Sequence, residues 1–256
     1  MEKLGLQLFT IRDFLKTPED VKKSFTKLVE LGYKEGQTAT ADWYGMGAEK
    51  FRDICKETGL SICGTHYSYD IIVNETDRAM KEHEIVGTTN IGIGGAPNLG
   101  SMTLESTKEF VEKFNIAAEK VAKHGFKLTY HNHHWEFAKV GDFTIMDYLV
   151  DNLDKNNVSF VLDTHWVQAG GGDVVAWIKK LAGRIDILHL KDFTIVEGER
   201  RFAEIFEGNI NFDGALKAAE EIGVKHYVVE QDTCPGDPFD SVKLSIDNLK
   251  KKGYLK

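Results

Sequence analysis

The sequence predicts an α/β protein that folds as a single (β/α)8 barrel, and three observations lead to this prediction. Eight short apolar runs alternate with segments of helical periodicity along the 256 residues. Glycines stand where several of the predicted helices end, just before the next strand. No Gly-x-Gly-x-x-Gly pattern follows the first strand, so the main signature of an open dinucleotide-binding sheet is missing. Eight βα units in succession favour closure into a barrel.

The predicted strands are short and separated by enough chain for a helix or a long loop. They are expected at residues 4–9, 33–38, 60–66, 89–94, 126–133, 158–165, 185–192 and 227–231. Between them, apolar residues recur on one helical face: Val21, Phe25 and Leu28; Phe110, Phe114, Ala117 and Val121; Val174, Ile178 and Leu181; Phe212, Leu216 and Ala219; Val242, Ile246 and Leu249. Thr17-Pro18 is typical of a helix start, and Gly32, Gly59, Gly87, Gly125 and Gly223 are typical of helix ends.

Composition limits the partners and the compartment. The net charge of -8 and the lack of a long basic run argue against nucleic acid, which requires clustered Lys and Arg. The three cysteines are widely separated and odd in number, which predicts reduced thiols in a cytoplasmic protein. We expect neither a signal peptide nor a membrane span. With only four prolines and no Ser/Gly-rich linker, residues 1–256 are predicted to form one domain.

Polar groups repeatedly stand where a predicted strand ends. His131, Asn132, His133 and His134 follow the fifth strand, while Asp163, His189 and Glu230 close the sixth, seventh and eighth. Alternation along a strand places Asp163 inward with Val161 and Ser159, and it places His189 and Lys191 inward together. In a barrel these strand ends surround the active-site mouth. A buried carboxylate there is costly unless it is paired or metal-bound, so the pattern predicts a metal site. Imidazole with carboxylate suits Mn²⁺, Zn²⁺, Co²⁺ or Fe²⁺ better than Mg²⁺.

Several segments together resemble the xylose isomerase-like barrel superfamily of sugar (phosphate) isomerases and epimerases, relatives of inosose dehydratases and endonuclease IV. They are residues 5–13, Gly32-Tyr33, 131–137, 162–166, 189–192, 208–212 and 229–232. The resemblance runs over essentially the whole chain. It implies one divalent cation held by Asp163, His189 and Glu230, with His131 at the fourth position, where the epimerases carry Glu. Two further departures are Gln37, where the family commonly has Glu, and Phe206, where glycine is usual and a narrower pocket is therefore expected.

The resemblance leads to a mechanistic hypothesis: metal-assisted proton abstraction next to a carbonyl of a sugar or polyol, through an enediolate that the metal stabilises. Glu230 is the first candidate for the base and Glu136 the second, while Lys191 would stabilise the oxyanion. The expected substrate-binding residues are Gln7, His66, His133, His165 and Trp166. An isomerase or epimerase is favoured first. A lyase of the same fold, which would dehydrate a keto-inositol or cleave a 3-keto-glycoside, is the alternative because His131 replaces a catalytic glutamate.

Two other classes of protein share this fold. A DNA-repair endonuclease would need more His and Glu ligands and a basic groove, which the net charge of -8 argues against. A non-catalytic sugar-binding subunit would keep the ligands without turnover. The resemblance is also compatible with a homo-oligomer. Trp43, Tyr44 and Trp135 are expected to be exposed and to line either the pocket or a subunit contact.

Overall fold

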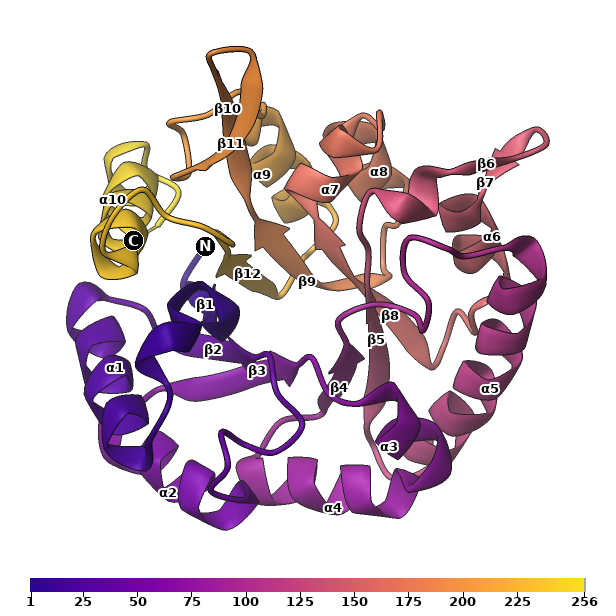
Figure 1. The fold of residues 1–256 in the computed structure, drawn as a ribbon, viewed down its shortest axis with the longest axis horizontal. Coiled ribbons are helices and arrows are strands. Elements are labelled where there is room, and N and C mark those ends of the chain that lie inside the picture. The colour runs from indigo at the N-terminus through magenta and orange to yellow at the C-terminus, as the bar shows by residue number, and fades with distance from the viewer. Residues whose placement is uncertain (256) are drawn as a thin grey trace.

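The computed structural model describes residues 1–255, and its centre is one sheet of eight parallel strands (Figure 1). The strands follow the order β3-β2-β1-β12-β9-β8-β5-β4. Their bounds are β1 Gly5–Gln7, β2 Glu35–Thr38, β3 Ser61–Thr65, β4 Asn90–Ile93, β5 Lys127–His131, β8 Val158–Asp163, β9 Ile185–Leu190 and β12 His226–Val229. All eight predicted strands are confirmed, and the (β/α)8 barrel is confirmed with them. Every strand is shorter than predicted, and β12 begins one residue before its predicted start.

The barrel nearly closes between β3 and β4, the two ends of the strand order. The amide of Tyr67 donates to the carbonyl of Gly92 at 2.7 Å, and Asn90 Nδ2 donates to the carbonyl of Cys63 at 2.9 Å. A Cβ at Gly92 would lie only 2.2 Å from the carbonyl oxygen of Thr65. Gly92 therefore allows the close approach of the two strands, which agrees with a packing role for this glycine.

Helices surround the barrel (Figure 1). They are α1 Pro18–Leu31, α2 Ala48–Thr58, α3 Tyr69–Asn74, α4 Thr76–Val86, α5 Leu104–Ala122, α6 Ile145–Asn152, α7 Thr164–Ala169, α8 Val174–Lys180, α9 Phe212–Glu221 and α10 Pro238–Lys251, with 3-10 turns η1 Leu8–Phe14 and η2 Trp135–Phe137. Thr17 caps α1 by accepting a hydrogen bond from the Asp20 amide at 3.1 Å, and Pro18 follows it. The predicted apolar faces are buried against the strands, so each helix covers part of the outer barrel wall.

Two antiparallel hairpins interrupt the βα order and were not predicted. One joins β6 Lys139–Val140 to β7 Phe143–Thr144, and the other joins β10 Asp192–Val196 to β11 Glu199–Ala203. Glu197 and Gly198 turn the second hairpin with positive φ at both residues. Since this hairpin directly follows β9, it begins at the carboxyl end of the barrel.

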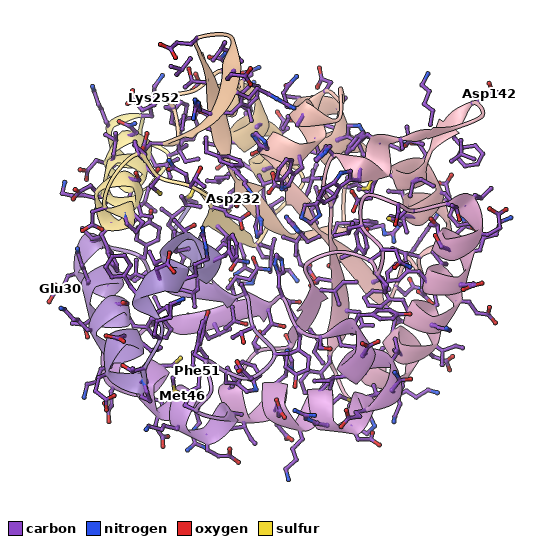
Figure 2. The ribbon with its side chains drawn as sticks, in the orientation of Figure 1. Glu30, Met46, Phe51, Asp142, Asp232 and Lys252 are labelled. Carbon is purple, nitrogen blue, oxygen red and sulfur yellow. The ribbon has the colours of Figure 1, made fainter. Side chains whose placement is uncertain are left out.

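The barrel interior is small, and the predicted inward register is confirmed. Cys63, Val161, Ile187 and Val228 form a separate apolar cluster inside the strands, while alternate residues such as Leu162 and Leu188 belong to the larger core beneath the helices. The ligand-type residues lie one step beyond this interior cluster on the same strands. Figure 2 shows Asp232 near the middle of the molecule, whereas Glu30, Asp142 and Lys252 lie at its rim.

Of three expectations about individual aromatic residues, one is confirmed and two are wrong. Trp43 is buried, with 1% of its surface exposed, and its Nε1 donates to Glu82 Oε2, so the expectation that it is exposed is wrong. Trp135 is exposed, as expected. Phe206 has a positive φ of 71°, which agrees with a position where glycine is usual. Its ring packs on Phe212 and Tyr254 rather than on the strand-end residues, so the expected narrowing of the pocket by Phe206 is wrong.

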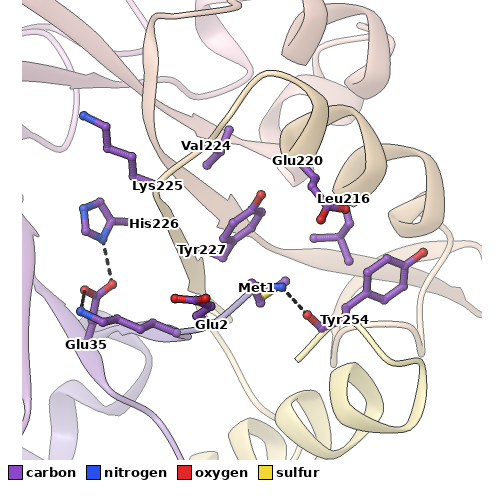
Figure 3. A pocket seen from close by; sticks show the side chains of 11 residues that line it. Met1, Glu2, Glu35, Leu216, Glu220, Val224, Lys225, His226, Tyr227 and Tyr254 are labelled. Carbon is purple, nitrogen blue, oxygen red and sulfur yellow. Dashed lines mark hydrogen bonds and ion pairs between the residues drawn. The ribbon is translucent and has the colours of Figure 1, made fainter. Parts of the chain in front are cut away.

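At the opposite, amino-terminal end of the barrel, the first residue contacts the segment that follows α10. The Met1 amino group donates to the carbonyl of Tyr254 at 2.6 Å beside a pocket at this end (Figure 3). Cys55, Cys63 and Cys234 are all free thiols, as predicted. Within residues 1–255, no helix has both the length and the apolar character needed to span a membrane.

Candidate metal centre

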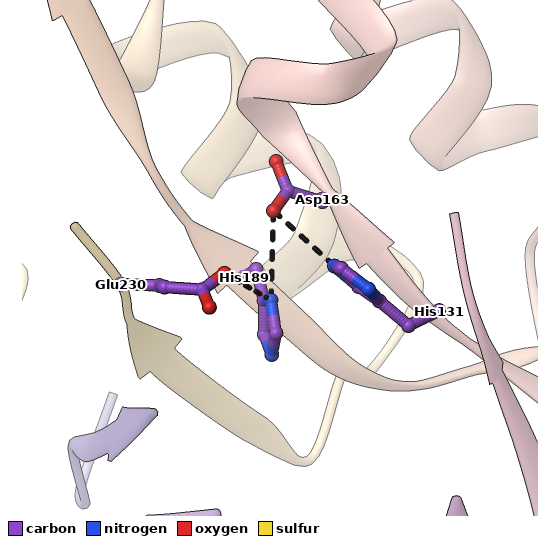
Figure 4. A group of neighbouring side chains, drawn as sticks. All are labelled: His131, Asp163, His189 and Glu230. Carbon is purple, nitrogen blue, oxygen red and sulfur yellow. Dashed lines mark hydrogen bonds and ion pairs between the residues drawn. The ribbon is translucent and has the colours of Figure 1, made fainter. Parts of the chain in front are cut away.

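Four of the predicted residues meet at the carboxyl ends of four neighbouring strands (Figure 4). His131 ends β5, Asp163 ends β8, His189 lies on β9, and Glu230 directly follows β12. One potential ligand atom from each lies within 4.8 Å of those of the others, and all four side chains are buried. His131 Nε2 lies 3.3 Å from Asp163 Oδ2, and His189 Nδ1 lies 3.0 Å from Glu230 Oε2.

Each histidine of the group has its outer ring nitrogen bound to the protein. His189 Nε2 lies 2.5 Å from Gln37 Oε1, and His131 Nδ1 lies 3.1 Å from the carbonyl of Gly94. Both acceptors are oxygens, so these nitrogens carry the protons and donate. When the two rings are neutral, as in a metal complex, the lone pairs of His189 Nδ1 and His131 Nε2 point into the group, which is how outer hydrogen bonds orient metal-binding imidazoles.

Asp163 is held in a similar way. It is the N-cap of α7, and its Oδ1 accepts a hydrogen bond from the Trp166 amide at 2.9 Å. Its own amide donates to Asn132 Oδ1 at 3.0 Å. Oδ2 is thereby left facing His131 and His189. The sequence analysis did not assign a role to Asn132, although its position beside His131 was visible.

Lys191 supplies a buried positive charge next to the group. Its Nζ lies 2.7 Å from Asp232 Oδ1, 3.1 Å from Glu230 Oε2 and 3.7 Å from Asp163 Oδ2. With both histidines neutral, as metal ligands must be, these three ionised carboxylates and one ammonium leave two negative charges. One divalent cation would balance that excess, which is otherwise unfavourable in a buried site.

The pKa shifts follow from burial opposed by these charges. Burial would raise the pKa of Asp163 and Glu230, but Lys191 and the neighbouring histidines hold both well below their ordinary values. Burial alone would lower the pKa of His189, but Glu230 and Asp163 raise it to about 9. Both carboxylates are therefore deprotonated at neutral pH, as ligands or a base must be.

The donor set fits a divalent metal ion. Two imidazole nitrogens and two carboxylates converge from rigid strand ends, and their combined charge is unbalanced without a cation. His189 Nδ1 is buried and makes no hydrogen bond to any of the described residues. Such an orphaned atom is explained if it is a metal ligand. The mixed nitrogen and oxygen donors favour Mn²⁺, Fe²⁺, Co²⁺ or Zn²⁺ over Mg²⁺.

Two of the expected substrate-binding residues lie beside the group on the side of β1 and β3. Gln7 Nε2 donates to Gln37 Oε1 at 3.1 Å and lies 3.4 Å from His66 Nδ1. The rings of His66 and His131 are 4.7 Å apart between centroids. Burial and the nearby His131 lower the pKa of His66, so its imidazole is neutral. Gln37 thus contacts His189 and Gln7, a role that the sequence analysis missed.

The other three form an aromatic wall. His133 lies 4.6 Å from His131 and 5.6 Å from Trp166, measured between ring centroids. His165 packs edge-on against Trp166 at 4.5 Å. Phe202, from the unpredicted hairpin β10–β11, covers His165 at 4.8 Å and lies 5.3 Å from Lys191 Nζ. The hairpin therefore helps to cover Lys191. The only sequence signal for this role is the position of the hairpin directly after β9.

Glu136 lies outside the group of four. Tyr130 Oη donates to its Oε1 at 2.7 Å, and the amide of His133 donates to its Oε2 at 2.9 Å. The side chain is fully buried, and burial raises its pKa. Both carboxylate oxygens are thus engaged by the protein, and Glu136 holds the turn that carries His133. Its assignment as a second base stays a prediction.

The fold and the strand-end cluster define a (β/α)8 barrel protein with a buried group of side chains at its mouth that could hold a metal ion. Residues 25–252 match the family described as xylose isomerase-like TIM barrel, and the chain belongs to that family. An inosose dehydratase from Clostridium perfringens is 24% identical over 169 residues, which are 59% of this chain and 56% of that protein. The chain thus matches little more than half the length of this relative.

Solved structures show the same fold over nearly the whole chain. A sugar phosphate isomerase/epimerase from Parabacteroides distasonis superimposes with a TM-score of 0.83 at 23% identity, covering 100% of this chain and 96% of the other. D-allulose 3-epimerase from Methylomonas sp. gives 0.73 at 13% identity, covering 98% of each chain. The family therefore has isomerase, epimerase and dehydratase relatives, and these relatives are enzymes.

Proposed function

We propose that this protein is a metal-dependent enzyme that removes a proton next to a carbonyl of a sugar or polyol. The observation that carries the proposal is the buried group His131, Asp163, His189 and Glu230, whose lone pairs converge beside Lys191. A divalent cation held by these four residues would supply Lewis-acid stabilisation of the negative charge that develops on a substrate oxygen.

Glu230 is the proposed base. Its Oε2 accepts a hydrogen bond from Lys191 Nζ at 3.1 Å and lies 3.0 Å from His189 Nδ1, so Oε1 would accept the substrate proton. Lys191 would stabilise the developing oxyanion by its charge. Gln7 and His66 would bind hydroxyls on one side of the site, and Trp166, His133 and His165 would enclose the sugar on the other, excluding water.

Dehydration is the proposed outcome, ahead of the isomerase or epimerase outcome that the resemblance alone favours. An epimerase needs proton-transferring groups on both faces of the carbon, and here His131 stands where the second carboxylate is expected. Once Glu230 has taken the proton, it could return this proton to the β-hydroxyl, which then leaves as water, so the elimination needs no second carboxylate. The match to inosose dehydratase, whose name describes this reaction class, supports the same choice.

Isomerisation or epimerisation is the second candidate, and a specific observation favours it. His66 Nε2 and His133 Nδ1 are buried and have no hydrogen-bond partner among residues 1–255. Burial lowers the pKa of both histidines, to about 3 for His133, so both rings are neutral at pH 7. Both rings lie next to that of His131, so either could exchange a proton with the substrate at a position separate from Glu230.

The test uses Mn²⁺-loaded protein in deuterated water with a panel of keto-inositols and keto-sugars, followed by NMR. Loss of water with an alkene product supports dehydration, whereas deuterium at one carbon of an isomerised sugar supports the second candidate. Glu230→Gln should lower either rate at least a hundredfold, while the exposed control Glu49→Gln should leave it unchanged. Metal-bound protein that produces neither result on the whole panel would favour a non-catalytic sugar-binding subunit.

A further inference from the structure

A second group of metal-ligand side chains lies at the opposite end of the barrel. Glu35 is the first residue of β2, His226 is the first residue of β12, and Cys63 lies in the middle of β3. One potential ligand atom from each lies within 4.8 Å of the other two. Glu35 and Cys63 are buried, and the side chain of His226 is 24% exposed.

The strand order explains why these three side chains meet. β1 lies between β2 and β12, and its Gly5 pairs with Glu35 on one side and Val228 on the other. A Cβ at Gly5 would lie 3.4 Å from Glu35 Cβ and 3.1 Å from Val228 Cγ2. Because Gly5 has no side chain, Glu35 and His226 can reach across β1, where Glu35 Oε2 and His226 Nδ1 are 2.8 Å apart.

The group is reachable from solvent. A pocket of about 370 Å³ at the amino-terminal face is lined by Glu35 and His226 (Figure 3). Cys63 belongs to the apolar cluster inside the barrel and does not line this pocket. Lys3 Nζ lies 3.8 Å from Glu35 Oε1, but the Lys3 side chain is 64% exposed and is free to turn away. An ion could therefore enter without unfolding the barrel.

The sulfur of Cys63 is engaged only weakly by the rest of the protein. Sγ makes one long contact, donating to the carbonyl of Gly36 at 3.5 Å. Burial raises the pKa of the Cys63 thiol, so the thiolate would form only when a cation takes the place of the proton. The proton would leave to solvent, one for each ion bound.

We propose that Glu35, Cys63 and His226 form a second metal site, for Zn²⁺ or Co²⁺, with its open coordination position toward the pocket. Thiolate and imidazole select these borderline ions over Mg²⁺ or Ca²⁺. Tetrahedral Zn²⁺ places ligand atoms roughly 3.4–3.8 Å apart. Separations as long as 4.8 Å must therefore shorten by roughly 1.0–1.4 Å, while Glu35 Oε2 and His226 Nδ1, which are 2.8 Å apart, must move slightly apart. The bound ion would link β2, β3 and β12 at the amino-terminal end of the barrel, opposite the first metal group.

A Co²⁺ titration of the full chain tests this site separately from the first. The first group contains no cysteine, so a thiolate-to-Co²⁺ charge-transfer band in the near ultraviolet reports only on the second. We expect the amplitude of the band to correspond to one Co²⁺ per chain, in addition to any Co²⁺ at the first group, which gives no such band. The band should disappear in Cys63→Ser. In Glu35→Gln and in His226→Ala, the Co²⁺ affinity measured from the band should fall at least tenfold. Cys234→Ser is the matched control and should leave the band unchanged.

Other outcomes would overturn the proposal. Absence of the band in the wild-type protein, or a band that survives in Cys63→Ser, would exclude Cys63 as a ligand. Loss of the band in Cys234→Ser would show adventitious binding at another thiol. If Cys63→Ser fails to fold, as judged by circular dichroism, His226→Ala decides, because the side chain of His226 is partly exposed and its removal leaves the interior packing intact. Unchanged Co²⁺ affinity in that variant would refute the site.

Discussion

Replacing Gln37 by Met removes the acceptor that holds the imidazole of His189 in one tautomer. Gln37 Oε1 accepts hydrogen bonds from His189 Nε2 at 2.5 Å and from Gln7 Nε2 at 3.1 Å, and it is fully buried. Without it, the proton of His189 can move to Nδ1, the atom that faces Asp163 and Glu230. Loss of such an outer partner lowers metal affinity by about 10- to 100-fold.

The same change leaves two buried donors without their acceptor. An unsatisfied buried donor costs about 1–3 kcal/mol, and Gln7 keeps a weaker contact to His66 Nδ1 at 3.4 Å, so the larger penalty falls on His189. We therefore expect the free energy of unfolding of the metal-free protein to fall by about 2 kcal/mol or more.

Chelator-competition titrations with Mn²⁺ measure the affinity, and urea unfolding measures the stability. Gln37→Glu is the matched control, because it keeps an oxygen acceptor for His189 Nε2 and should bind Mn²⁺ at least as tightly as the wild type. If Gln37→Met binds Mn²⁺ within twofold of the wild type while His189→Ala does not bind it, the assignment of the His189 tautomer is wrong.

Three further predictions concern single side chains. Lys191→Met leaves buried carboxylates unpaired, so urea unfolding should show a loss of about 3–5 kcal/mol in the metal-free protein and a smaller loss with Mn²⁺ bound; equal losses would contradict the charge balance. Glu136→Ala should destabilise by about 3 kcal/mol through the lost bonds to Tyr130 and His133, while Mn²⁺ affinity stays within threefold; loss of metal binding in folded protein would place Glu136 in the site. Burial lowers the pKa of His83 to about 4, against about 6.5 in the unfolded chain. The unfolded state then binds more protons between these values, so His83 removes about 2 kcal/mol of stability from pH 7 to pH 5; His83→Gln should flatten the stability–pH curve there, and an unchanged slope would refute this.

The eight strands and the inward register could be predicted because both depend on local pattern. An apolar run of four to six residues bounded by glycine marks a buried parallel strand, and alternation then fixes which side chains face inward. Asp163, His189 and Glu230 converge because strands β8, β9 and β12 are neighbours, which the barrel order requires. Most of the predicted strands extended too far at their carboxyl ends, because the polar residues after a strand continue its extended pattern into the loop.

Features that depend on how loops return to the barrel could not be predicted. The hairpin β10–β11 is half polar and largely exposed, so it lacks the buried apolar run of a barrel strand, yet it brings Phe202 over His165. Glu136 follows the histidine run after a single residue, Trp135, and for that reason was expected in the site. The turn η2 directs it back to Tyr130 instead, and sequence adjacency does not determine the direction of such a turn.

The central claim is that one divalent cation binds where β5, β8, β9 and β12 end. The most direct measurement is anomalous diffraction from crystals grown with Mn²⁺, recorded on both sides of the Mn absorption edge. We expect one peak within about 2.0–2.4 Å of atoms from His131, Asp163, His189 and Glu230, with His189 bound through Nδ1. Absence of a peak there at full Mn²⁺ saturation, or a peak only elsewhere in the molecule, would contradict the claim.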